Sequence, residues 1–382
     1  MKVIIAVTHL LGTGHLSRAL TLGRAFSAAG HAVTVVSGGC AAPQLSTRGV
    51  AFEQLPPLRS DGLAFSRLLA ADGALANADY HAARQRHLQS LIRSLHPDAL
   101  ITELYPFGRR SLQAEFQVLL EAAHALPERP LVLSSIRDIL APPSKPRKAE
   151  AADAVIAQYY DAVLVHSDPK ATRLETSWPV SPALSQRLRY TGYVAPPAMA
   201  PHPDRAGAAE ILVSAGGGSV GDALYACAVQ AAKEMPDRTW RLLIGGTDAA
   251  ERIAALSDPA SPAILEPARP DFRAMLPHAA ASVSMCGYNT ALDLLQSGVP
   301  AVLVPFDAGN EVEQSLRARS LATLSGVAVE TAARLTPARL CTALSQVMQD
   351  PQRSLDGFRF DGAARSVDIA ETLHRALRPS QR

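Results

Sequence analysis

The sequence predicts an α/β protein made of two doubly wound, Rossmann-like domains that face each other across a cleft. Two observations predict this fold class. Short apolar strands alternate with helices along the chain, and a proline-rich stretch interrupts this alternation once, near the middle. Strand, helix, strand at these lengths is a βαβ unit, which requires a parallel sheet. At 382 residues the chain is also too long for one ordinary core.

The first domain is expected to span residues 1–193. It opens with a strand at Lys2–Val7, a glycine-containing turn, a helix ending at Gly30 and a strand at Ala32–Val36. The region 38–79 is expected to be loop-rich, because it holds several glycines and the pair Pro56-Pro57. A further exposed loop is expected at 141–148. The other predicted elements are a helix near His81–Leu95 and buried strands at Ala99–Thr102, Leu131–Ile136 and Asp161–Val165.

Residues 194–207, VAPPAMAPHPDRAG, are expected to link the domains, since prolines at this density make a stiff, extended connector. A second domain is then expected over 208–365, and a helix within 366–382 that crosses back onto the first domain. The second domain contains a predicted helix at Tyr288–Ser297 that stops at Gly298. Its predicted strands are Ile211–Ser214, Trp240–Ile244, Ile264–Glu266, Ala281–Met285 and Ala301–Val304.

Composition excludes several classes of protein. Hydrophobic residues make up 48% of the chain and charged residues 19%, which excludes a disordered chain, and a net charge of +2 gives no argument for a nucleic-acid partner. The four cysteines form no closely spaced pair, so we expect neither a zinc site nor disulfides, and a cytoplasmic location. No apolar run is long enough to span a bilayer. Peripheral membrane contact and oligomeric state stay open.

His15 is the first candidate catalytic residue. It follows Gly12 and Gly14 at the carboxyl end of the first strand, where parallel sheets bind their ligands. A neutral imidazole there is suited to general-base catalysis. A histidine that packs against or caps the helix start is the alternative. Ser17 stands where a dinucleotide fingerprint has its third glycine, which argues against an NAD site.

Glu103 is the second candidate, because it follows the strand Ala99–Thr102 and precedes the pair Arg109-Arg110. Two arginines at a strand end could hold an acidic group on a substrate. A surface turn with a salt bridge explains the same residues equally well.

In the second domain, Gly216-Gly217-Gly218-Ser219 separates a strand from a helix, the arrangement of a loop that binds diphosphate. A simple tight turn is the alternative. Asn310 and Glu313 have the spacing of a capping box at the start of a later helix, so Glu313 has a purely structural interpretation too.

Three strings carry a family resemblance: GTGHLSR at 12–18, AGGGS at 215–219, and GYNTALDLLQSGVPAVLVP at 287–305 with EQSLRA at 313–318. Together they resemble the glycosyltransferases with the two-domain GT-B fold, in particular the family 28 group typified by MurG. TELYPFGRR at 102–110 resembles a string in a bacterial group of predicted glycosyltransferases. The resemblance implies transfer of a sugar from a nucleotide-sugar substrate, with a UDP-sugar favoured, to an acceptor hydroxyl that the sequence does not identify.

The resemblance also implies roles for individual residues. His15 would be the general base, with Glu103 as the substitute candidate, and neither a metal nor another cofactor would be needed. In the donor site, Asp293 would bind the ribose, and Arg269 to Phe272 would lie near the base. Phosphate contacts would come from Gly216–Ser219, Gly287, Asn289 and Thr290, and sugar contacts from Glu313 and Gln314.

Other functions remain open on the sequence. The GTGHLSR loop is equally similar to that of a UDP-sugar hydrolase, in which His15 would activate water. A non-hydrolysing sugar-nucleotide epimerase shares the fold, and a binding protein could keep the nucleotide pocket without turnover.

Overall fold

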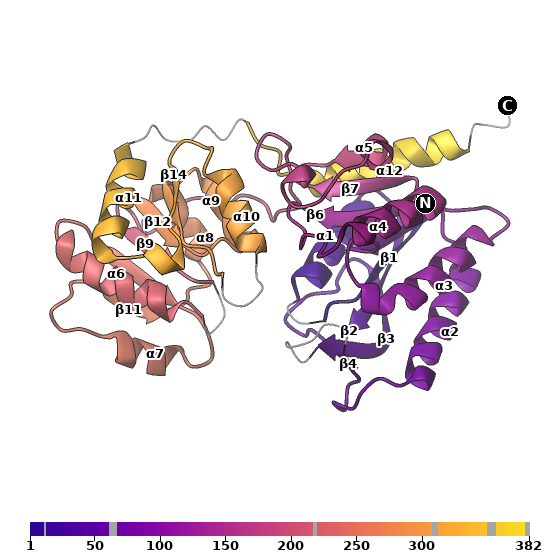
Figure 1. Ribbon diagram of the computed structural model, residues 1–382, viewed down its shortest axis with the longest axis horizontal. Helices are drawn as coiled ribbons and strands as arrows, with labels where there is room; N and C mark the ends of the chain where they lie inside the picture. The colour runs from indigo at the N-terminus through magenta and orange to yellow at the C-terminus, as the bar shows by residue number, and fades with distance from the viewer. Residues whose placement is uncertain (11–12, 61–66, 217–219, 308–311, 350–356, 379–382) are drawn as a thin grey trace. The chain divides into compact units, whose positions relative to one another are not determined.

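The computed structural model describes residues 1–10, 13–60, 67–216, 220–307, 312–349 and 357–378 (Figure 1). The chain divides into two compact units. Unit 1 comprises Met1–Pro169, Arg173–Val194 and Asp361–Arg382, and unit 2 comprises Lys170–Thr172 and Ala195–Phe360. Each unit is a sheet covered by helices, and the predicted α/β class is confirmed.

The described part of unit 1 forms an eight-stranded sheet in the order β4-β3-β2-β1-β5-β6-β7-β8. All neighbouring strands are parallel except β3 and β4. Each strand predicted in this unit is present, with ends that differ by at most three residues. The strands are β1 (Lys2–Val7), β2 (Ala32–Gly39), β3 (Ala51–Ser60), β4 (Leu68–Leu69), β5 (Ala99–Glu103), β6 (Leu131–Arg137), β7 (Ala162–His166) and β8 (Leu188–Tyr190).

Side-chain alternation along β1 divides the core of unit 1 into two layers. Val3, Ile5 and Val7 pack in one apolar cluster with α1 and α12, whereas Ile4 and Ala6 pack in another with the remaining helices. This is the period of two expected of a strand buried on both faces. The helices are α1 (Gly14–Ala28), α2 (Ala78–Leu95), α3 (Gln113–His124), α4 (Pro146–Tyr159), α5 (Pro182–Arg187) and α12 (Gly362–Leu377).

Two loop predictions in this unit are wrong in part. Strand β3 occupies ten residues of the region expected to be loop-rich, and it pairs in parallel with β2. Its register shifts between Ser37 and Gly39, and this irregularity accommodates Pro56-Pro57, which cannot donate to a regular ladder. Similarly, the stretch expected to be an exposed loop at 141–148 ends inside α4, which begins with Pro146. Proline is favoured in a first helical turn because its missing N–H has no partner there anyway.

In unit 2 the residues that the structure describes form a six-stranded parallel sheet in the order β11-β10-β9-β12-β13-β14. Helix α9 spans Tyr288–Ser297 as predicted, and Gly298 ends it with φ at 69°, the left-handed conformation that glycine adopts most readily. The strands are β9 (Ile211–Ser214), β10 (Trp240–Ile244), β11 (Ile264–Pro267), β12 (Ala281–Ser284), β13 (Ala301–Leu303) and β14 (Val327–Val329). The other helices are α6 (Asp222–Glu234), α7 (Ala249–Leu256), α8 (Phe272–Met275), α10 (Glu313–Leu321) and α11 (Pro337–Gln349).

Each sheet has a topological switch point, where successive connections leave toward opposite sides. In unit 1 it lies between β1 and β5, and in unit 2 between β9 and β12. Open α/β sheets bind ligands beyond the strand ends at this position. His15, Glu103, Gly216 and Asn289 all lie at or just beyond the carboxyl ends of these four strands.

Helix α12 belongs to unit 1, although it is the last helix of the chain (yellow in Figure 1). Its residues Val367 and Ala370 join the same apolar cluster as α1. The start of the helix lies against the chain at 192–194: the Gly362 amide donates to the Tyr193 carbonyl, and Asp361 forms a bridge with Val194. A Cβ atom at Gly362 would stand 2.4 Å from the Gly192 carbonyl oxygen and 2.7 Å from the Tyr193 backbone.

We therefore expect Gly362→Ala to destabilise unit 1 by about 1–3 kcal/mol, because rigid backbone would have to move to admit the methyl group. Urea unfolding measures this. Gly357→Ala is the matched control, since a Cβ there meets nothing within 4 Å. If both variants unfolded at the wild-type midpoint, the close approach at Gly362 would be without energetic consequence.

Candidate active site

His15 and Glu103, predicted separately, lie together. His15 is in the first turn of α1, and its Nδ1 atom is 2.9 Å from Oε1 of Glu103, the last residue of β5. The side chain of His15 is 16% exposed and that of Glu103 only 1%. Nδ1 is also 3.1 Å from Nη2 of Arg18, which can only donate a hydrogen bond. Because the contact with Glu103 is shorter and an ionised carboxylate only accepts, we assign the hydrogen to Nδ1 and the lone pair to Nε2. This is the tautomer that a general base requires.

The carboxylate of Glu103 is bonded on both oxygens. Arg18, one helical turn after His15 on α1, donates to Oε1 and is itself buried. The hydroxyl of Ser135 on β6 donates to Oε2 over 2.6 Å. The next residue of the chain, Leu104, has φ at 70°, a conformation that costs a non-glycine residue about 1–3 kcal/mol. Glu103 is thus an enclosed carboxylate that fixes His15, and its burial makes it unsuitable as a substitute base.

The electrostatic state of the pair follows from burial and charge. Burial lowers the pKa of His15 to about 4, which outweighs the raising effect of Glu103. Burial alone would raise the pKa of Glu103, but Arg18 and His15 together hold it well below its usual range. At neutral pH the site therefore contains a neutral imidazole beside an ionised carboxylate.

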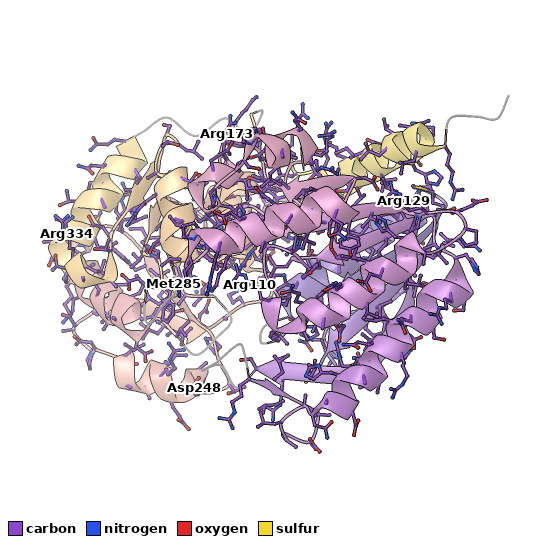
Figure 2. All side chains as sticks on the ribbon, turned by 45° about the vertical axis from the view of Figure 1, so that its right-hand side comes forward. Arg110, Arg129, Arg173, Asp248, Met285 and Arg334 are labelled. Carbon is purple, nitrogen blue, oxygen red and sulfur yellow. The ribbon has the colours of Figure 1, made fainter. Side chains whose placement is uncertain are left out.

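The two arginines after β5 are engaged with backbone carbonyls. Arg109 donates through Nε to the Thr8 carbonyl over 2.6 Å, and Arg110 through Nη2 to the Phe107 carbonyl over 3.3 Å (Arg110 is labelled in Figure 2). Burial lowers the pKa of Arg110. That they hold an acidic group of a substrate stays a prediction.

In the two glycine-containing loops, after β1 and after β9, Gly12, Gly217, Gly218 and Ser219 lie outside the described residues. Among the described residues, a Cβ at Gly14 would meet no atom within 4 Å, and neither would one at Gly216, where φ is 89°. The helix after the second loop begins at Asp222, with Gly221 as its N-cap at φ 93°.

Arg252, which no sequence pattern singled out, stabilises the end of this loop. Its guanidinium donates to the Asp222 carboxylate at 2.6 and 2.8 Å and, over 2.7 Å, to each of the Val220 and Gly245 carbonyls. The residue connects the loop after β9 with the end of β10. Nothing in the local sequence marks it, because its partners lie seven to 32 residues away.

The amino end of α9 fits an anion. Gly287 is its N-cap, no side chain caps it, and its first turn holds no acidic residue. Asn289 is exposed in that turn, and Thr290 is half-buried. Free N–H groups at an uncapped helix start carry partial positive charge. The buried guanidinium of Arg317 adds positive charge next to this helix start, because it donates to the Cys286 carbonyl over 3.0 Å. Cys286 directly follows Met285, which is labelled in Figure 2.

Asp293, assigned to the ribose, is ion-paired in this structure. Its Oδ1 atom accepts from Nε of Arg273 over 2.6 Å, and burial raises the pKa of this carboxyl while Arg273 opposes the rise. Arg273 also donates to Gln296 and to the Pro197 carbonyl. The pair lines a small hollow together with Met199, Pro277, Gln296 and Ser297.

Gln314 and Glu313 begin α10. The Oε1 atom of Gln314 accepts from the backbone amides of Cys286 and Phe306 at 3.0 and 3.1 Å, so the side chain joins the ends of β12 and β13. The expected capping box is wrong as regards Glu313, which is the first residue of the helix, with Val312 as N-cap. Asn310 lies outside the described residues. Arg269, expected near the base, is ion-paired with Asp271 at 2.6 Å.

Within the described ranges, no group of three or more His, Cys, Asp or Glu side chains is placed to hold a metal ion. Metal independence remains a prediction. A search of the same residues finds no helix that is both long and apolar enough to cross a membrane.

Comparison with known proteins agrees with this geometry. Residues 211–372 match the glycosyltransferase family 28 C-terminal domain. A UDP-N-acetylglucosamine–N-acetylmuramyl-(pentapeptide) pyrophosphoryl-undecaprenol N-acetylglucosamine transferase of Brucella anthropi is 34% identical over 143 residues, which are 36% of this chain and 38% of that protein. The enzyme of the same name from Rhizobium etli is 36% identical over 67 residues, 18% of each chain. The chain thus matches less than half of the length of these relatives.

Solved structures extend the similarity of fold to the whole chain. MurG of Acinetobacter baumannii aligns over 100% of both chains with a TM-score of 0.63 and 16% identity. The glycotransferase of kitacinnamycin aligns over 98% of this chain and 99% of its own with a TM-score of 0.64 and 20% identity. The resemblance noted in the sequence is confirmed: residues 211–372 match the glycosyltransferase family 28 C-terminal domain, and the fold of the chain is that of the GT-B glycosyltransferases, MurG among them.

Proposed function

We propose that this protein is a glycosyltransferase that moves a sugar from a nucleotide-sugar, with a UDP-sugar favoured, to the hydroxyl group of an acceptor. The observation that carries the proposal is the His15–Glu103 pair at the switch point of unit 1. A neutral, partly exposed imidazole on a buried, ionised carboxylate is suited to removing a proton from a hydroxyl.

In the proposed reaction, Nε2 of His15 takes the acceptor's proton while the acceptor oxygen forms a bond to the anomeric carbon. The bond from that carbon to the diphosphate oxygen breaks, and the nucleoside diphosphate leaves with the electron pair. Glu103 stabilises the imidazolium that forms, because it is already ionised and hydrogen-bonded to Nδ1. No metal takes part in the proposed reaction.

Unit 2 is the proposed donor site. The uncapped start of α9, with Gly287, Asn289 and Thr290, would bind the diphosphate together with the glycine loop that begins at Gly216. Asp293 would accept hydrogen bonds from the ribose hydroxyls, which would replace part of its hydrogen bonding to Arg273. Glu313 and Gln314 would contact the sugar, and Arg269 the base.

The relatives' names support UDP as the nucleotide, since they designate a UDP-N-acetylglucosamine as substrate. From these names we take only the class of donor, a UDP-sugar, as a proposal for this chain, and we propose no particular acceptor. We also propose a cytoplasmic location, because nucleotide-sugars would meet the protein there and its four cysteines form no disulfide.

The proposal is tested by incubating the protein with UDP-sugars, with and without a panel of acceptors, in the presence of EDTA. Transfer to an acceptor that persists in EDTA supports it. Release of UDP that requires no acceptor would indicate the hydrolase, and binding without turnover under any condition would indicate a binding protein. Loss of transfer in EDTA with recovery in magnesium or manganese would contradict metal independence.

His15→Ala is expected to lower kcat by about two to four powers of ten, the usual contribution of a general base. Binding of UDP should change less than twofold, because the proposed donor contacts are in unit 2. Isothermal titration and initial rates measure both. A histidine that serves packing alone predicts the reverse, lower stability and near-normal kcat.

The rate should respond to pH in a way that the lowered pKa of His15 determines. Only neutral imidazole accepts a proton, so kcat/KM should stay level from pH 8 to about pH 5 and fall as pH drops through about 4. An acid limb near pH 6.5, as an unperturbed histidine would give, contradicts the burial of the base. Stability must be followed in parallel: a lowered histidine pKa means that the unfolded state binds more protons, so folding weakens as pH falls from 6.5 toward 4.

Asp293→Ala is expected to weaken UDP binding about 10- to 100-fold, the effect of removing a hydrogen bond to a charged group. Gln296→Ala is the control, because it also removes a bond to Arg273 from the same helix but no proposed ribose contact. Thermal shift with UDP compares the three proteins. Equal affinity of Asp293→Ala and wild type would refute the ribose assignment, and equal loss in both variants would assign the effect to Arg273.

A further inference from the structure

The bonds of Glu103 continue into the interior of unit 1. Oγ of Ser135, which donates to Glu103 over 2.6 Å, is 2.9 Å from Nε2 of His166, and Nδ1 of His166 is 2.9 Å from Oγ1 of Thr191. Ser135, His166 and Thr191 are each fully buried. They come from β6, from the last residue of β7 and from the residue after β8. One chain of hydrogen bonds therefore crosses the carboxyl ends of four neighbouring strands and ends at His15.

The direction of these bonds is determined by the carboxylate. Glu103 accepts, so the single hydrogen of the Ser135 hydroxyl points to it. Ser135 is then an acceptor for the N–H at Nε2 of His166. Burial lowers the pKa of His166 to about 3, with Arg18 adding to the effect and Glu103 opposing it, so the imidazole is neutral and has one N–H. Its Nδ1 atom then faces the Thr191 hydroxyl, whose single hydrogen also has the Gly192 carbonyl at 2.7 Å and the Val165 carbonyl at 3.3 Å as acceptors.

We propose that His166, acting through Ser135, is a positioning residue for His15: it holds the Glu103 carboxylate in the orientation that keeps the hydrogen of His15 on Nδ1. This inference rests on the proposed function and adds residues that no sequence motif indicated. His166 does not touch the reacting atoms and is not a catalytic residue.

A role in packing alone explains the arrangement poorly. An imidazole with no exposed surface costs free energy to bury unless both nitrogens are bonded, and an apolar residue at the end of β7 would avoid that cost. His15 and Arg18 both bond Oε1 of Glu103, whereas Ser135 is the partner that the structure gives to Oε2. Without it, the carboxylate keeps its bonds at Oε1 alone and can turn about its last side-chain bond.

The test compares four single variants and one double variant. Ser135→Ala and His166→Leu break the chain at successive links, and His166→Gln keeps an amide N–H close to the position of Nε2. Ser134→Ala is the matched control: this neighbouring serine of β6 is equally buried, and its hydroxyl donates to the Tyr105 carbonyl, not to Glu103.

We expect Ser135→Ala and His166→Leu to lower kcat about 10- to 100-fold at unchanged KM for the donor, since a misplaced base affects turnover more than binding. His166→Gln should recover most of the loss, and Ser134→Ala should be active. The double variant Ser135→Ala/His166→Leu should be no slower than Ser135→Ala, because His166 acts only through the serine. Additive losses in the double variant would overturn the proposal.

A spectroscopic measurement separates this proposal from the proposed function. Imidazole ¹⁵N spectra of histidine-labelled protein, assigned with His15→Ala and His166→Leu, report the tautomer of each ring without any substrate. His15 should carry its hydrogen on Nδ1 in wild type and Ser134→Ala, and should populate the other tautomer in Ser135→Ala. A wild-type His15 tautomer in folded Ser135→Ala and His166→Leu would refute the positioning role, whereas transfer activity that survived His15→Ala would refute the proposed base alone.

Discussion

The buried carboxylate of Glu103 is the group on which the site in unit 1 depends. Removing an ionised carboxylate from water costs several kcal/mol unless charged and polar partners surround it. Arg18, His15 and Ser135 are these partners, and they come from α1 and β6, on either side of β5. The same bonds that make the charge tolerable also fix the base. Stability and chemistry therefore depend on one set of contacts, and a change in any partner affects both.

Both units use the same topology for different chemistry. At its switch point unit 1 presents a neutral base on an enclosed anion, whereas unit 2 presents an uncapped helix start next to the buried Arg317. The first arrangement is suited to removing a proton and the second to binding a negative charge. In unit 2 two carboxylates near the proposed site are ion-paired, Asp293 with Arg273 and Asp222 with Arg252. This pairing lowers their repulsion of an anionic ligand.

Local patterns in the sequence predicted much of the fold, and the strand ends in particular. They predicted β1 and α9 to the residue and placed His15 and Glu103 at carboxyl strand ends, because periodicity and turn residues are local signals. They did not predict β3, whose prolines normally argue against a strand. Strand order is not a local property either. That β5 lies beside β1, and so brings Glu103 to His15 across 88 positions, required the structure. His166 was visible in the sequence as a polar strand end, without a sign of its partner.

The low pKa of the proposed base raises a question of mechanism, because a histidine that titrates near 4 binds protons weakly. This low proton affinity is that of the protein without substrates, in which burial destabilises the imidazolium form of His15. In the proposed reaction, an acceptor hydroxyl becomes strongly acidic only as its oxygen forms the bond to the anomeric carbon, so the proton would move late. At that moment the imidazolium would form against the fixed charge of Glu103, and the departing diphosphate would carry away negative charge. A base that is neutral at all physiological pH values and gains its stabilisation only in the transition state favours turnover over ground-state binding.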